Sequence, residues 1–414
     1  MMSFSEILLE DKGGKNLHLE HIEDEILNYG VDGGRAAINF LRSLRDMLSG
    51  STRSSLNMTV KWDGAPAIFA GVEPETGDFF VAKKSVFNVN PKLYKTAQEI
   101  DDDLSGALNE KFKVALAEFS KLGIEGVLQG DLMFTDDVET ETIDDDKYYT
   151  FQPNTIVYAV PVDSVLGKVI KKAKVGIVWH TTYTGETLQG MTASFGADIA
   201  GLKKSSSVWM DDATYKDVSG KATFTTAETE KITAVLSQTG KTFNKINANK
   251  LRTFLTVQNG MTGAIAGASL KTYNNSKVRA GEKISNPSAH AKGYEKWVQM
   301  SIQKQIDKAK SDKGKKKYTD MQKEYMREVR KHTGNLVQII TFQNLLVDAK
   351  MQIVKKLNSV KGLTDTFVKT KDGFKVTNPE GYVAIDRISG GAVKLVDRME
   401  FSYNNFTAVK AWDK

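Results

Sequence analysis

Apolar side chains recur at spacings of three and four residues in two parts of the N-terminal half of the chain, a pattern typical of amphipathic helices. The first part covers residues 16–50, where glycines at positions 30, 33 and 34 predict a break between two helices. The second part covers residues 92–122, where five apolar residues share one face: Leu104, Leu108, Phe112, Leu116 and Phe119. Both parts are therefore predicted to be helical.

Segments rich in β-branched and aromatic residues predict strands in other parts of the chain. Residues 57–90 are predicted to form two strands joined by a turn at Pro-Glu-Thr-Gly-Asp. Further strands are predicted at residues 126–134, 155–162, 174–183, 381–388 and 392–403. Strands are therefore expected near both ends of the sequence.

A mostly helical block is predicted between these strands. Proline is absent from residues 162–286 and 288–378, and apolar residues between Tyr318 and Leu357 step at helical intervals. Gly334 is predicted to separate two helices there. The expected fold is α+β, with antiparallel sheets interrupted by a helical insertion. Four domains or domain parts are predicted: an N-terminal helical segment (1–55), the first part of the sheet domain (56–224), the helical insertion (225–360) and the second part of the sheet domain (361–414).

The composition is ordinary for a globular protein, with 40% hydrophobic and 26% charged residues. The absence of cysteine excludes disulfides, thiolate zinc sites and thiol nucleophiles. No apolar run reaches membrane-spanning length, and the first residues include acidic side chains that are not typical of a signal peptide. We therefore expect a cytoplasmic protein with no membrane partner. The sequence carries no prediction of the oligomeric state.

The positive charge is concentrated in one segment. Residues 301–331 hold 11 Lys and Arg against 5 Asp and Glu, a net charge of +6 that equals the net charge of the whole chain. A focused basic patch attracts the phosphate backbone of nucleic acids, so this segment is a candidate binding surface for RNA or DNA. The alternative is a solvated helix face with a lysine-rich turn.

The segment Lys61-Trp62-Asp63-Gly64 directly follows a predicted strand and carries the leading candidate chemistry. A deprotonated lysine amine can attack the α-phosphorus of a nucleoside triphosphate and expel pyrophosphate, which leaves a covalent phosphoramide. Partial burial or a second cation nearby would lower the pKa of this lysine toward neutrality. A neighbouring glycine would let the backbone approach the phosphates. The alternative is a plain turn that closes a hairpin.

At this motif the chain resembles the covalent nucleotidyltransferases, the family of ATP-dependent RNA and DNA ligases and mRNA-capping enzymes, whose first motif is K-x-D-G. Later segments resemble further motifs of that family in the same order. They are Gly130-Asp131-Leu132-Met133, the strand Ile156-Val157-Tyr158-Ala159-Val160, Glu380-Gly381-Tyr382-Val383 and Lys394-Leu395-Val396. The KWDGAPA segment is also similar to one in tailed-phage proteins, which would place this chain in the cytoplasm of a phage host.

The resemblance implies a nucleotidyltransferase (adenylation) domain that uses ATP and Mg²⁺ or Mn²⁺. Lys61 would be the nucleophile, and Lys394 would neutralise charge at the α-phosphate and lower the pKa of Lys61. Asp131 and Glu380 would hold ribose hydroxyls or the metal ion, and Tyr158 would stack on the base. The full set of predicted nucleotide-binding residues is Lys61, Asp63, Gly64, Lys83, Lys84, Asp131, Tyr158, Glu380, Lys394 and Arg398.

Each of the later motifs also has a plainer interpretation. Asp131 could be an ordinary residue near a strand end, and Tyr158 could be a core side chain. Glu380 and Gly381 could form a turn after Pro379. His18 and His21 could share a helix face for a metal ion, but a surface or capping role is favoured because no other ligand is near in the sequence.

The function expected from the resemblance is that of an ATP-dependent polynucleotide ligase acting on RNA or DNA ends or nicks. Only sixteen residues follow Arg398, which leaves no room for the oligonucleotide-binding barrel that DNA ligases and capping enzymes append. RNA ligases use helical accessory domains instead, so an RNA ligase is favoured.

Three departures from the family pattern keep alternatives open. Pro66 stands where the family often has arginine, Asp131 replaces a glutamate, and Val396 replaces the second lysine of the fifth motif, with Arg398 as its candidate replacement. One alternative is a covalent nucleotidyltransferase that uses GTP or another acceptor. The other is a degenerate ligase fold that binds nucleic acid or serves a structural role in a phage.

Overall fold

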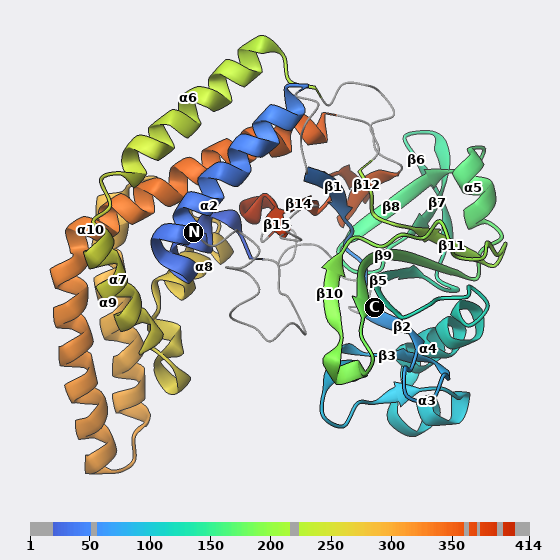
Figure 1. Cartoon of the computed structure of the whole chain (residues 1–414), viewed down its shortest axis with the longest axis horizontal. Helices are drawn as coiled ribbons and strands as arrows, with labels where there is room; N and C mark the ends of the chain where they lie inside the picture. The colour runs from blue at the N-terminus through green and yellow to red at the C-terminus, as the bar shows by residue number, and fades with distance from the viewer. Residues whose placement is uncertain are drawn as a thin grey trace.

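The computed structural model describes residues 20–50, 56–215, 223–359, 364–370, 373–386 and 392–401. The chain is a mixed α+β protein. Figure 1 shows a body of long helices on one side, the two larger sheets on the other, and a three-stranded sheet between them. Among the described helices, none combines the length and the apolarity needed to span a bilayer.

The helical body buries one continuous apolar core. It consists of η1 (Ile22–Asp24), α2 (Glu25–Leu48), α6 (Thr226–Phe243), α7 (Ala248–Asn259), η4 (Gly263–Ala268), α8 (Leu270–Arg279), α9 (Pro287–Lys308) and α10 (Asp312–Asn358). Its helices place apolar residues on one face at helical spacing, and buried examples are Leu44, Phe254, Tyr294, Leu336 and Phe342. Since α2 shares this core with α6 and α10, the described residues of the predicted segment 1–55 and of the predicted insertion 225–360 pack as one body.

The sequence predicted one helix break at the glycines of positions 30, 33 and 34 and another at Gly334, and only the first is found. Gly30 has a φ of +64° and kinks α2, as expected from the sequence. Gly334 lies inside α10, which is a single 47-residue helix, so the predicted break there is wrong. The buried residues on both sides of Gly334 hold the helix on the core, and this packing outweighs the poor helix propensity of glycine.

The three-stranded sheet joins distant parts of the chain. Strand β14 (Gly381–Asp386) lies between β1 (Leu56–Lys61) and β15 (Ala392–Leu395), and all pairings are antiparallel. One face of this sheet packs on the helical body through Met58, Tyr382, Ala384, Val393 and Leu395. The insertion therefore separates these strands in the sequence but also supports the sheet that they form.

The seven-stranded sheet has the order β10-β9-β5-β2-β3-β4, with β11 paired to β9 in parallel. Its strands are β2 (Ala67–Val72), β3 (Phe79–Ala82), β4 (Leu93–Tyr94), β5 (Val127–Phe134), β9 (Val175–Thr184), β10 (Thr192–Phe195) and β11 (Val208–Asp211). The helices α3 (Ala97–Asp103) and α4 (Gly106–Phe119) fall within the predicted helical stretch 92–122. They cover one face of the sheet, where Phe112 and Phe119 are fully buried.

The five-stranded sheet completes the fold with the order β13-β12-β8-β7-β6. Its strands are β6 (Glu139–Ile143), β7 (Asp146–Phe151), β8 (Ile156–Pro161), β12 (Asp365–Thr370) and β13 (Gly373–Val376). The short helices α5 (Val165–Ile170), η2 (Lys84–Phe87) and η3 (Leu188–Gly190) lie in connections. An aromatic core that includes Trp62, Phe134, Phe151, Tyr158 and Trp209 contains side chains from both larger sheets.

The predicted strand that contained Lys61 is two strands. β1 ends at Lys61 in the three-stranded sheet, and β2 starts at Ala67 in the seven-stranded sheet. The chain changes sheet over the Trp-Asp-Gly-Ala-Pro segment because Gly64 fits against β5 and Pro66 has no amide hydrogen to donate. At the other end, β15 stops at Leu395 and the chain turns helical over residues 398–401, which shortens the strand predicted for 392–403.

Candidate active site

A cleft of about 230 Å³ lies between the three-stranded and the seven-stranded sheets. Successive side chains of a strand point to opposite faces, so the residues that alternate with the helix-facing set point into this cleft. From the three-stranded sheet these are Thr59, Lys61, Val383, Ile385 and Lys394. From the seven-stranded sheet the lining includes Gln129, Asp131, Val178, His180, Thr181, Tyr183, Ala193 and Phe195. Two of the predicted lysines and one predicted carboxylate therefore share one cleft.

The amino group of Lys61 forms an ion pair with the carboxylate of Glu380. The Lys61 side chain is 27% exposed, whereas that of Glu380 is 2% exposed. Burial lowers the pKa of Lys61, but the charges of Glu380 and Asp131 outweigh this effect and hold the pKa above its ordinary value. This direction is opposite to the lowered pKa expected from the sequence, because the carboxylates of this site had not been expected to lie so close to the lysine.

The pKa of Glu380 is raised as well, but for a different reason. Burial raises the pKa of its carboxyl group, although the nearby Lys61 and Lys394 pull it down. Gly381 makes this position possible, since its φ of +152° is a conformation that side chains rarely adopt. A Cβ atom at Gly381 would also come within 2.6 Å of the Leu395 carbonyl oxygen. The Glu-Gly pair is thus an element of the site as well as the turn that sequence alone would suggest.

The pKa of Lys394 is lowered, in contrast to that of Lys61. Burial, followed by the charge of Lys61, lowers the pKa of Lys394 to about 8, with smaller contributions from Arg398 and Lys350 in the same direction. Its amino group lies 5.4 Å from the centre of the Phe401 ring. Lys394 thus changes charge nearer to neutral pH than an ordinary lysine does.

Asp131 and His180 face each other on adjacent strands of the cleft. The His180 Nε2 atom lies 3.8 Å from an Asp131 carboxylate oxygen, and its Nδ1 atom lies 2.8 Å from the hydroxyl of Thr181. The β5–β9 pairing skips one residue there, because Gln129 pairs with Thr181 while Gly130 pairs with Trp179. This bulge turns two consecutive side chains, His180 and Thr181, into the cleft.

Asp63 serves the structure of the motif. Its carboxylate accepts hydrogen bonds from the Asn154 side chain at 2.7 Å and from the amides of Thr155 and Ile156 at 2.8 and 3.0 Å. Its own amide donates to the hydroxyl of Tyr158 at 2.6 Å. Asp63 therefore fastens the segment after Lys61 to the start of β8, and its carboxylate is engaged by protein donors instead of being free for a nucleotide.

Tyr158 lies in the core and does not line the cleft around Lys61. Its side chain is 2% exposed, and its ring packs 4.9 Å from that of Trp62, measured between ring centres. Tyr158 borders a separate cavity of about 280 Å³ with Trp62 and Pro379, so the predicted stacking on a base in the Lys61 cleft is not met by this position. The aromatic side chains that do line the cleft are Trp62, Tyr183 and Phe195.

Gly64 allows the backbone after Lys61 to approach strand β5 closely. A Cβ atom at Gly64 would lie 2.5 Å from the Cβ atom of Asp131 and 3.1 Å from the Leu132 carbonyl oxygen. The glycine therefore lets the Lys61 segment pack directly on β5, which brings Lys61 and Asp131 to the same cleft. The expected role of approaching phosphates is replaced by this packing role.

Three predicted basic residues point elsewhere. Lys83 forms an ion pair with Asp103 of α3 at 3.1 Å, and Lys84 is exposed at the start of η2. Arg398 contacts Glu23 at 3.3 Å, Asp24 at 3.2 Å and the side chain of Asn275. None of the three lines the cleft. Arg398 consequently does not replace the missing second lysine of the fifth motif.

The partners of Arg398 form a buried ionic network behind Lys394. Glu23 is bound through both carboxylate oxygens by Lys350 of α10, each at 2.9 Å. Burial raises the pKa of Glu23, but Lys350, His21 and Arg398 outweigh it and bring the pKa to about 2. The network ties η1, α10 and the segment after β15 together. These acidic residues precede the predicted motifs in sequence, so no motif indicated that they would sequester Arg398.

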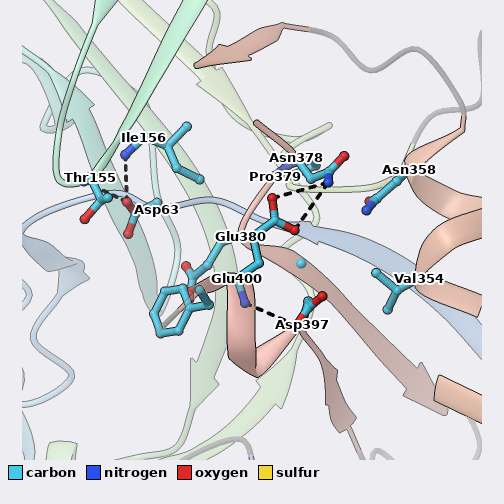
Figure 2. Close-up of a pocket in the computed structure, with 12 residues that line it drawn as sticks. Asp63, Thr155, Ile156, Val354, Asn358, Asn378, Pro379, Glu380, Asp397 and Glu400 are labelled. Carbon is cyan, nitrogen blue, oxygen red and sulfur yellow. Dashed lines mark hydrogen bonds between the residues drawn. The ribbon is translucent and has the colours of Figure 1, made fainter. Parts of the chain in front are cut away.

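Glu380 also borders a second, small cavity of about 20 Å³, room for roughly one water molecule. Figure 2 shows Asp63, Glu380, Asp397 and Glu400 around it. The Asn378 side chain donates to Glu400 at 3.4 Å, and the Glu400 amide donates to Asp397 at 3.2 Å. Glu380 therefore separates this acidic cavity from the lysine-lined cleft.

The cleft has the donor set that a nucleoside triphosphate requires. Lys61, Lys394 and His180 can meet phosphates, Asp131 can accept from ribose hydroxyls, and Phe195 offers an apolar surface to a base. The cleft volume is below the range of about 300–1,000 Å³ typical of ligand pockets, so part of a bound triphosphate would extend beyond it.

A metal ion would be held mainly by the nucleotide. Within the described part of the chain, no group of three or more His, Asp or Glu residues is arranged to hold a metal ion. Mg²⁺ commonly uses one or two carboxylates together with phosphate oxygens and water. Asp131 can serve in this way, whereas the Glu380 carboxylate must first leave Lys61.

The sequence pointed to the lysines but missed His180 and the role of β9. No motif in the sequence includes His180, because only the pairing of β5 with β9 brings it to Asp131. His21 precedes η1 and forms a backbone bridge with Lys394, while His18, its predicted companion, lies outside the described residues.

The fold and the site define an α+β protein with a lysine-containing cleft between two sheets. A family model matches residues 16–410, nearly the whole chain, and is described as a family of unknown function, DUF6267. The chain belongs to this family. No curated protein and no solved structure matches it. The activity must therefore be inferred from the site itself.

Proposed function

We propose that the chain is a covalent nucleotidyltransferase that becomes adenylylated on Lys61 and acts as an ATP-dependent polynucleotide ligase. The observation that supports this most directly is the convergence of Lys61, Asp131 and Lys394 on one cleft, with Glu380 in contact with Lys61. These residues come from four strands or strand ends, and their order along the chain is that of the family motifs. In this proposal the three sheets form an adenylation domain, and the helices from α6 to α10 are its insertion.

The first step transfers AMP to the protein. The ammonium of Lys61 gives up a proton, and Glu380 is the nearest acceptor, with a pKa raised by burial. The neutral amine then attacks the α-phosphorus of ATP, an N–P bond forms, and the bond to the β-phosphate oxygen breaks with release of pyrophosphate. Lys394 stabilises the negative charge at the α-phosphate. A bound Mg²⁺ would supply further charge neutralisation on the triphosphate.

The later steps follow ligase chemistry. The phosphate at a 5′ end attacks the lysyl-AMP phosphorus, which breaks the N–P bond and moves AMP onto the nucleic acid. A 3′-hydroxyl then attacks that 5′-phosphate, forms the phosphodiester and releases AMP. We favour RNA ends over DNA ends because a helical body occupies the place of an accessory domain in this chain.

One experiment tests the first step. The purified full chain is incubated with Mg²⁺ and either α-labelled ATP or α-labelled GTP, and the label is followed on a denaturing gel. Label from ATP that disappears in Lys61→Ala and Lys61→Arg, but persists in the exposed-lysine control Lys203→Ala, supports the proposal. Label from GTP alone favours a GTP-dependent nucleotidyltransferase. Absence of label with both nucleotides overturns the enzymatic proposal.

A second candidate is a degenerate ligase fold that binds nucleic acid without joining it. The observation that favours it is the capture of Arg398 by Glu23 and Asp24, which leaves Lys394 as the cation that β15 contributes to the cleft. A panel of nicked and single-stranded RNA and DNA substrates distinguishes the two. Joined product that depends on Lys61 supports a ligase, whereas binding without product supports the degenerate fold.

A further inference from the structure

The tip of the α9–α10 hairpin carries a dense group of exposed lysines. Eight lysines lie within residues 304–323, against three acidic residues, which gives this tip a net charge of +5. All eight are exposed, and within the described part of the chain none forms an ion pair. They are Lys304, Lys308, Lys310, Lys313, Lys315, Lys316, Lys317 and Lys323.

The basic residues further along α10 are different. Arg330 binds Glu295 of α9 at 2.6 Å, Arg327 binds Glu328 at 3.3 Å, and Lys331 lies 3.6 Å from Glu328. These three residues belong to the basic segment recognised in the sequence, yet their charges are met by neighbouring carboxylates. Most of the unpaired charge of the basic segment therefore lies in the tip, residues 304–323.

The tip lies far along α10 from the cleft. The C-terminal end of α10 is fixed to the three-stranded sheet, where the Tyr382 hydroxyl donates to the Asn358 side chain at 2.7 Å. From Lys323 to that end the helix has a contour length of about 50 Å at 1.5 Å per residue. In Figure 1 the far end of the α9–α10 pair projects away from the sheets. A ligand that touches both places must itself be tens of ångströms long.

The tip also lacks the features of other anion-binding surfaces. The described chain exposes few large apolar side chains, and none of them lies within residues 304–323, so the tip cannot insert into a membrane. Tyr318 is the tip's one aromatic residue and is half-buried beneath Lys317, 5.8 Å from its amino group. Proteins that hold single strands combine charge with exposed aromatic platforms, and this tip has charge alone.

We propose that residues 304–323 bind the phosphate backbone of a double-helical segment of nucleic acid at a distance from the end held in the cleft. This proposal rests on the proposed function in one respect, namely that the cleft holds the end of a nucleic acid. A duplex that reaches from the cleft to the tip along about 50 Å would have up to roughly 15 base pairs of B-form DNA, or about 18 of A-form RNA, between the two contacts. The substrate class is thus a structured RNA or DNA with a long helical arm, in preference to a short single strand.

Fluorescence anisotropy with the full chain tests this directly. The probe is a fluorescent RNA duplex of about 24 base pairs, roughly 65 Å long in A-form geometry, with a DNA duplex and a single strand of equal length for comparison. The variant Lys315/Lys316/Lys317→Gln is matched by Lys168/Lys171/Lys172→Gln, three exposed lysines on and next to α5. The tip variant should bind about tenfold more weakly at about 0.15 M salt and lower the salt-dependence slope by about one per lysine removed.

Restoring the positive charge of the tip, together with the control comparisons, completes the test. Lys315/Lys316/Lys317→Arg should restore binding, which shows that charge and not folding is responsible. Equal losses in the tip variant and the α5 variant, or a wild-type chain that binds duplex no better than single strand, overturn the proposal. Tip-dependent binding to phosphatidylserine vesicles with no effect on duplex binding overturns it in favour of a membrane surface.

Labelling of Lys61 separates this proposal from the proposed function. The tip variant should retain full labelling from ATP, because the tip is remote from the cleft. If labelling fails in every protein while duplex binding still depends on the tip, the enzymatic proposal falls and the binding surface stands. If Lys61 is labelled and duplex binding ignores the tip, only the binding surface falls.

Discussion

Lys61 and Glu380 meet as a partly buried ion pair although one lies at the end of β1 and the other directly before β14. The pairing of β1 with β14 brings Lys61 opposite Gly381, so the sheet itself fixes the contact. In the free protein this contact keeps the Lys61 amine protonated. The proposed reaction then requires that a bound nucleotide, or a shift of the proton to Glu380, releases the amine.

Removing the charge of Glu380 should make Lys61 more reactive toward simple amine reagents. The Glu380→Gln variant keeps the size of the side chain but loses the charge that raises the pKa of Lys61, so this pKa should fall. The pH profile of Lys61 acylation, followed by peptide mass spectrometry, should move to lower pH, while exposed Lys203 serves as an internal reference. An unchanged profile would show that Glu380 does not control the lysine.

Replacing Lys394 should stabilise the protein most near neutral pH. The pKa of Lys394 is lowered from 10.5 to about 8, so below pH 8 the folded state carries a poorly solvated charge. Between pH 8 and 10.5 the unfolded chain binds more protons than the folded chain, and wild-type stability rises with pH. The stability gain of Lys394→Met should therefore shrink by up to about 3 kcal/mol from pH 7 to pH 10.5, as measured by urea unfolding.

Replacing Asp63 should first of all lower the free energy of unfolding, before any effect on a reaction at Lys61. In Asp63→Ala the side chain of Asn154 and the amides of Thr155 and Ile156 lose their acceptor, and the expected cost is about 3 kcal/mol. Urea unfolding measures this, with the exposed Asp163→Ala as a control that should change little. A variant as stable as wild type would contradict the structural role and return Asp63 to the nucleotide site.

Gly334 should be replaceable by alanine with a gain in stability. It is exposed inside α10 and a Cβ atom there meets nothing within 4 Å, so the better helix propensity of alanine should add about 1 kcal/mol. Gly64→Ala is the opposite case, because its Cβ atom would lie 2.5 Å from that of Asp131 and should destabilise by about 1–3 kcal/mol. Thermal unfolding of both variants tests the two expectations, and a loss at Gly334 would indicate a true helix end there.

Periodicity predicted most of the regular structure. The strands around Gly130, Tyr158 and Trp179 and the helical character of residues 225–360 are confirmed, because their patterns reflect local burial. The errors arose where tertiary contacts decide. The strand across Lys61 divides between two sheets because Gly64 packs on β5, and α10 continues through Gly334 because the core on either side holds it.

The site was predicted in outline, and its electrostatics were not. The resemblance to the family motifs associated Lys61 with Lys394, but no local pattern indicated that Glu23 and Asp24 would withdraw Arg398. His180 reaches the cleft through a bulge that depends on the register of two strands 50 residues apart. Register and ion-pair choice depend on partners distant in the sequence, so single-chain patterns do not specify them.

The three-stranded sheet has a consequence for biosynthesis. Lys61 and its partner Glu380 are separated by 319 positions, and β15 follows later still. At about 5–20 residues per second, a ribosome needs roughly 16–60 s after making β1 before the strands that complete the cleft exist. A nascent chain, or one truncated before β14, therefore cannot assemble this cleft, which can form only after nearly the whole polypeptide has emerged.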